Sequence, residues 1–133
     1  RIALLSVDPA GFAAVLAARG QHPDLGAAEA AVLGFTHAEF GARLLERWRL
    51  PVILVRAVEY HHQPDTAPTG PLTDLTHMAD HLAHAMADNT LEQLITAGAP
   101  NNAVIRLGLT RVQCIEALAP VPEQVETLAA IME

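Results

Sequence analysis

The sequence predicts an all-α domain built as a helical bundle. Apolar residues recur at helical spacing along almost the whole chain, and no segment shows the alternation of a half-buried strand. Residues that cap helices precede several of these segments. Apolar residues make up 51% of the 133 residues but aromatic residues only 4%, so we expect an aliphatic core.

The first two predicted helices lie between residues 8 and 33. Asp8 is a typical N-cap, and Pro9 suits the first turn that follows it. The first helix is expected to end at Gly20, because glycine favours helix ends. After a short loop, the second helix is expected over residues 25–33.

The next two predicted helices are separated by a proline. Thr36 and Glu39 have the spacing of a capping box, which predicts a helix start. The pair Leu50-Pro51 is expected to end that helix. A further helix is then predicted from Pro51 to His61 or His62.

The second half of the chain is also predicted to be helical. Gln63 to Gly70 is expected to be a loop, since it contains two prolines and a glycine. The remaining predictions are a helix at about 72–87, a short one capped by Thr90, an irregular segment over 97–102, a helix from Thr110 to Leu118, and a last helix from Pro120–Pro122 to Met132.

Charge and composition exclude several classes of protein. The net charge is −7 and the eight basic residues are scattered, which argues against a nucleic-acid surface. No apolar run approaches the ~20 residues of a membrane span, and no secretion signal is recognisable. The single cysteine, Cys114, fits a core position in a protein of the reducing cytoplasm. We therefore expect neither a nucleic-acid nor a membrane partner.

Four residues could form a metal site. His37 starts one predicted helix, His61 and His62 end the next, and Asp80 lies inside a third. Imidazole and carboxylate groups from separate packed helices can converge on one transition metal. The alternative is that His37 faces solvent, while the other two histidines interact with the C-terminal end of a helix dipole.

A second histidine group has a simpler interpretation. His77, His81 and His84 share one face of a predicted helix, where the first two could chelate a metal. Because this face lies away from the apolar row that begins at Leu75, a solvated polar stripe is the favoured interpretation. No local pattern indicates a serine nucleophile or a phosphate-binding glycine loop.

The order of these segments resembles the C-terminal part of the HDOD domain, a bacterial signalling domain related to the HD superfamily. The resemblance rests on GFTHAEFGARLLERWRLPVILVRAVEYHHQP (34–64), LTHMADHLAHAM (75–86), the opening RIALLSVDPAGFAAVLA and the closing residues 106–132. It implies one HD-type helical bundle over residues 1–133. The chain begins with Arg1 and without methionine, so we expect a fragment that lacks the N-terminal helices.

The resemblance also implies what the site residues would do. HD relatives are metal-dependent phosphohydrolases, in which His37, His61 and His62 match additional histidines and Asp80 matches the late aspartate. The His-Asp doublet of those enzymes would fall before Arg1, and the Gly-Tyr-Pro sequence of cyclic-diguanylate enzymes is absent after His62. The expected metal site is therefore degenerate.

Two functions follow from this resemblance. The first is a non-catalytic signal-transduction module that acts on another protein domain or on a second copy of itself. Apolar residues near the start of the chain, such as Leu4 and Leu5, would be covered by that partner or by preceding chain. The second is a metal-dependent phosphohydrolase, in which a metal-bound water attacks and Arg43 or Arg47 neutralises phosphate.

Overall fold

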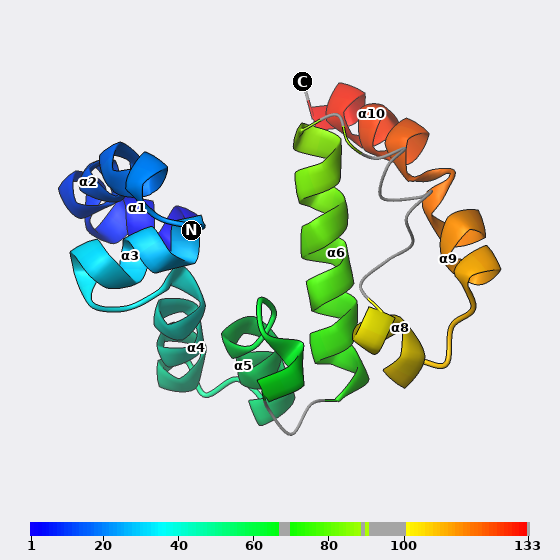
Figure 1. Ribbon diagram of the computed structural model, residues 1–133, viewed down its shortest axis with the longest axis horizontal. Coiled ribbons are helices and arrows are strands. Elements are labelled where there is room, and N and C mark those ends of the chain that lie inside the picture. Colours follow the sequence, from blue (N-terminus) through cyan, green and yellow to red (C-terminus); the bar gives the residue numbers. More distant parts are fainter. Residues whose placement is uncertain (67–69, 89, 91–100, 133) are drawn as a thin grey trace. The chain divides into compact units, whose positions relative to one another are not determined.

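The computed structural model describes residues 1–66, 70–88, 90 and 101–132, and every regular element in these residues is helical (Figure 1). This confirms the predicted all-α class. The α-helices are α1 (Ile2–Val7), α2 (Pro9–Ala18), α3 (Leu25–Leu33), α4 (His37–Arg47), α5 (Val52–Glu59), α6 (Pro71–Ala87), α8 (Asn101–Arg106), α9 (Arg111–Leu118) and α10 (Val121–Met132). Short 3-10 helices cover Arg19–Gln21 and Pro64–Thr66.

The chain divides into two compact units, Arg1–His62 and Gln63–Glu133. The first contains α1 to α5 and the second contains α6 to α10. The single domain expected over residues 1–133 stays a prediction. Within the described part of the chain, no helix is long and apolar enough to cross a membrane.

Polar side chains cap the starts of α2, α3 and α4, and the sequence predicts the caps at Asp8 and Thr36. Asp8 accepts a hydrogen bond from the backbone N–H of Gly11 at 2.9 Å, and Asp24 accepts one from Ala27 at 2.7 Å. Thr36 and Glu39 form the predicted capping box at the start of α4. These side chains satisfy N–H groups that a helix cannot pair internally.

Small residues allow close packing in the N-terminal unit. Its buried apolar residues are aliphatic, as expected: Leu4, Val15, Ala28, Ala38, Ala42, Val55 and Ala57. Helix α4 approaches α5 so closely that a Cβ atom on Gly41 would lie 2.8 Å from Cγ1 of Val58. Glycine at this position therefore brings the two helices together.

Several predicted boundaries are wrong. Helix α5 ends at Glu59, so His61 and His62 lie in the turn that follows it rather than at its end. Helix α2 ends at Ala18 and continues as a 3-10 turn. Asn101 and Asn102 begin α8, where an irregular segment was expected. The helix expected after Thr90 lies outside the described residues.

An ion-pair network joins the elements of the C-terminal unit. The Arg106 side chain, on α8, donates hydrogen bonds to Asp74 of α6 and to Asp65. Hydrogen bonds from Asn102 and Arg106 hold the pKa of Asp65 below its ordinary value. The bond to Asp74 is the main cause of a raised pKa for Arg106, which stays charged. The network fixes α8 against the first turn of α6.

Candidate functional site

Three of the four predicted metal ligands meet in the N-terminal unit. One ring nitrogen from each of His37, His61 and His62 lies within 4.8 Å of the other two. The rings pack against one another, with centroids 4.9 Å apart for His37 and His62 and 4.0 Å apart for His61 and His62. We call these three residues the histidine cluster. The fold thus brings His37 together with the adjacent pair His61 and His62.

The local structure explains why the cluster forms. His37 is the first residue of α4, where the cap at Thr36 fixes the chain direction. His61 and His62 follow the last turn of α5. The close approach of the two helices at Gly41 then places the start of α4 beside the end of α5.

Hydrogen bonds fix the orientation of two of the rings. Nδ1 of His37 lies 2.6 Å from the Glu29 carboxylate, and Nδ1 of His61 lies 2.6 Å from the Val58 carbonyl oxygen. Both partners accept only, so each Nδ1 atom bears the hydrogen and donates it. In the neutral rings, Nε2 is then the basic nitrogen, which is the form that a metal requires.

His62 completes the arrangement. Its Nε2 atom lies 2.9 Å from Nε2 of His37, close enough for a hydrogen bond when His62 holds the proton. Two nitrogens bound to one tetrahedral metal at about 2.1 Å stand roughly 3.4 Å apart. Metal binding through this nitrogen would require a small outward movement of His62 and a shift of its proton from Nε2 to Nδ1.

The environment keeps His37 neutral. Burial lowers its pKa below the ordinary 6.5, and this effect outweighs the neighbouring Glu29 carboxylate, which acts to raise the pKa. Burial disfavours a charged imidazole because the ring loses its hydration. A neutral His37 is available as a ligand at neutral pH.

The lowered pKa predicts how stability depends on pH. Between pH 6.5 and the depressed pKa of His37, the unfolded chain binds a proton that the folded chain does not. The free energy of unfolding should therefore fall as the pH is lowered through this window. Urea unfolding of metal-free protein at pH 7.5, 6.5 and 5.5 measures the slope. His37→Asn should show a shallower slope, and an equal slope in both proteins would contradict the prediction.

The donor set fits a borderline transition metal. Imidazole suits zinc, iron, nickel and copper, whereas calcium and magnesium prefer oxygen ligands. Three protein nitrogens on a tetrahedral ion leave one position for water or another ligand. The histidine cluster could therefore hold one such ion with an accessible coordination position.

Asp80, the fourth predicted ligand, lies on α6 in the C-terminal unit. There its Oδ1 atom is 3.7 Å from Nε2 of His84, one helical turn further along. Its membership in a metal site with the histidine cluster stays a prediction.

The second histidine group differs in part from the expected solvated stripe. His77 is buried, whereas His81 and His84 are exposed. The rings of His77 and His81 stack edge to face, with centroids 4.5 Å apart. Burial, followed by the charge of His77, lowers the pKa of His81. Leu75, expected to face the core, is 50% exposed, so the buried face of α6 is rotated from the predicted one.

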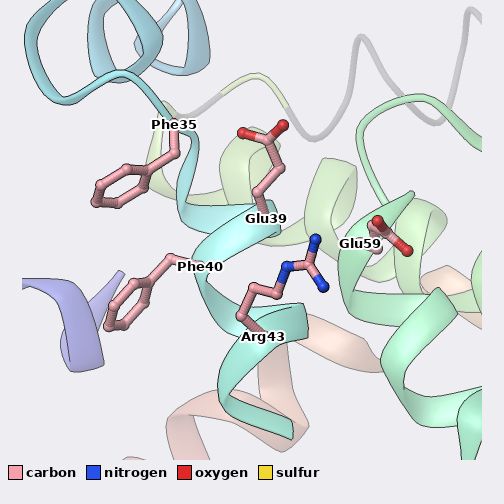
Figure 2. Close-up of a pocket in the computed structure, with 5 residues that line it drawn as sticks. All are labelled: Phe35, Glu39, Phe40, Arg43 and Glu59. Carbon is pink, nitrogen blue, oxygen red and sulfur yellow. The ribbon is translucent and has the colours of Figure 1, made fainter. Parts of the chain in front are cut away.

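A pocket of about 360 Å³ also lies in the N-terminal unit. Its lining residues are Phe35, Glu39, Phe40, Arg43 and Glu59 (Figure 2). The two phenylalanine rings stack with centroids 5.9 Å apart, while the charged side chains form a separate group in Figure 2. Two carboxylates and one guanidinium give this pocket a net negative charge.

Glu29 is the site residue that the sequence analysis missed. It lies in α3 within the segment Leu25–Leu33, is fully buried, and contacts His37 through both the ring and the backbone N–H. The only available signal was its position as a single charged residue in an alanine-rich helix.

The fold and the histidine cluster define an all-α protein in which three histidines converge. Residues 1–64, the segment that contains the cluster, match the model of the HDOD domain family. The match ends at Pro64, and the resemblance of residues 65–133 stays a prediction. Neither a curated protein nor a solved structure matches the chain.

Proposed function

We propose that this protein is a non-catalytic regulatory module of the HDOD type, which acts through protein interaction in the bacterial cytoplasm. We further propose that its histidine cluster holds one divalent transition metal. The observation that supports both points is the composition of the cluster: three imidazoles and no carboxylate within the set.

This composition favours a single metal over a hydrolytic pair. Two-metal centres hold their ions about 3.5–4 Å apart and neutralise both attacking and leaving oxygens. Three neutral imidazoles provide ligands for one ion and no negative charge to hold a second. The single ion would be a regulatory or structural ligand that links α4 to the turn after α5.

The charges near the cluster also disfavour a phosphate substrate. Arg43 is one of the two arginines, with Arg47, that would neutralise phosphate in a phosphohydrolase, but its side chain is 82% exposed and pairs with Glu46 at 3.0 Å. It also shares its pocket with Glu39 and Glu59. Such a field repels anions unless a metal or further cations compensate it.

Exposed apolar residues support an interaction role. Trp48, Val52 and Ile53 are 62%, 63% and 51% exposed, and they lie close together in sequence at the corner between α4 and α5. Neighbouring exposed apolar side chains commonly mark protein interfaces. The partner would be another protein domain or a second copy of this chain.

The second candidate function is a metal-dependent phosphohydrolase. The observation that favours it is the tautomer of His37 and His61, since both rings offer Nε2 to a metal that retains one open position. A water molecule in that position would become more acidic when bound. Asp80 would be the carboxylate ligand in this alternative.

Hydrolysis assays separate the two functions. The full chain is loaded with Zn²⁺, Mn²⁺ or Fe²⁺ and incubated with a nitrophenyl phosphodiester and with cyclic diguanylate. We expect metal binding but no turnover above that of His61→Ala/His62→Ala. Turnover that this variant abolishes would contradict the regulatory proposal and establish the phosphohydrolase. His84→Ala is the matched control, because it removes an exposed histidine outside the cluster.

A further inference from the structure

Glu29 is a buried carboxylate with an unusual set of contacts. Its side chain is fully shielded from solvent. One oxygen, Oε2, accepts from the backbone N–H of His37 at 2.7 Å and from Nδ1 of the same residue at 2.6 Å. The other oxygen, Oε1, has no hydrogen-bond partner among the described residues. Burying a carboxylate in this way costs free energy, so its retention calls for a specific reason.

Helix capping does not supply that reason. Thr36 and Glu39 already form a complete capping box at the start of α4. The bond from Glu29 to the backbone of His37 adds one more satisfied N–H group there. The bond to the imidazole ring, by contrast, adds nothing to the helix and acts only on the ring of the cluster.

Charge gives a second argument. A divalent ion held by three neutral imidazoles would sit in a partly buried site without a compensating negative charge. The Glu29 carboxylate contacts Nδ1 of His37. It therefore provides a negative charge beside the ring whose Nε2 atom would bind the ion. Carboxylate–histidine–metal arrangements of this kind make the ligating nitrogen more basic and fix its direction.

We propose that Glu29 is a positioning residue of the histidine cluster, which holds His37 as the Nδ1–H tautomer and directs its Nε2 atom to a bound divalent metal. The part of this inference that concerns the bound metal rests on the proposed metal-binding function. The part that concerns the tautomer of His37 does not. The orientation of the His37 ring is a property of the metal-free protein. The two halves can therefore be measured separately.

Two substitutions at Glu29 test the proposal in the full chain. Glu29→Gln keeps an oxygen that accepts from His37 but removes the charge, whereas Glu29→Leu removes both. Nitrogen-15 NMR of the metal-free imidazoles reports the tautomer of His37. We expect Nδ1–H in the wild type and in Glu29→Gln, and a mixture of tautomers or the Nε2–H form in Glu29→Leu.

Zn²⁺ affinity, measured by competition with a chromophoric chelator, gives the second readout. We expect a loss of about 10-fold in Glu29→Gln and about 100-fold in Glu29→Leu, the range found for partners of metal-ligating histidines. Glu39→Gln is the matched control, since it changes a glutamate at the start of α4 that contacts Thr36 rather than the ring. It should bind Zn²⁺ like the wild type.

The possible outcomes are distinct. A wild-type tautomer in folded Glu29→Leu would overturn the positioning role, and unchanged Zn²⁺ affinity in Glu29→Gln would contradict the contribution of the carboxylate charge. A wild-type protein that binds no Zn²⁺ would instead refute the proposed metal centre, and the metal-free spectra would still decide whether Glu29 orients His37. If Glu29→Leu does not fold, Glu29→Ala replaces it in the tautomer measurement, because it also removes the acceptor.

Discussion

Replacing both His61 and His62 with alanine is expected to lower Zn²⁺ affinity by at least about 100-fold. Loss of a residue that only hydrogen-bonds to a metal ligand costs up to about 100-fold, and loss of the ligand itself should cost more. Only His37 would remain in the cluster, and a single imidazole is a weak site. The two residues lie beyond the last turn of α5, so the fold should persist. Elemental analysis of tag-free protein and a Zn²⁺ titration measure the effect.

The same measurements test whether Asp80 is a fourth metal ligand. His84→Ala serves as the control and should retain wild-type metal content. Asp80→Ala should lower the affinity if its carboxylate is a fourth ligand, and should leave it unchanged if the three imidazoles suffice. Equal metal content in the wild type and the double histidine variant, with both proteins folded, would refute the metal centre.

The Gly41→Val substitution is expected to reduce both stability and metal affinity. Its Cβ atom would lie 2.8 Å from Cγ1 of Val58, and a valine in a helix has little rotamer freedom to move away. Overpacking of this kind typically costs about 1–3 kcal/mol. Because α4 and the turn after α5 supply the residues of the cluster, separating α4 from α5 should also lower Zn²⁺ affinity.

The Gly20→Val substitution distinguishes the loss of close helix packing at Gly41 from a general effect of replacing glycine with valine. At Gly20, an added Cβ would meet no atom within 4 Å, so Gly20→Val should change the free energy of unfolding by only about 0.5 kcal/mol. Denaturant unfolding and Zn²⁺ competition are measured on all three proteins. A Gly41→Val protein with wild-type stability and affinity would show that the close approach is not required.

The sequence predicted features that depend on neighbouring residues. Asp8, Thr36 and Thr110 each cap a helix through a bond to a backbone N–H group three residues later. Such contacts are local, and their residue types are specific. The convergence of His37 with the two later histidines was predicted because ligands on separate packed helices can meet at one metal.

Features that depend on packing were missed. Helix α5 stops at Glu59 without a glycine or other clear end signal, so the sequence could not place its last turn. Helix α8 has only six residues, too few for a recognisable period. The burial of Glu29 and His77 depends on other helices, and charged or polar residues in helices usually face solvent.

The histidine cluster is also local in the order of the chain. All three rings come from one helical hairpin, and no more than 25 residues separate His37 from His62. Closing so short a loop costs little chain entropy, and contacts between near neighbours form early when a protein folds. The histidine cluster can thus form from α4, α5 and the turn after α5 before more distant segments of the chain have folded. A metal ion captured at that stage would act as a template for the remaining helices of its unit.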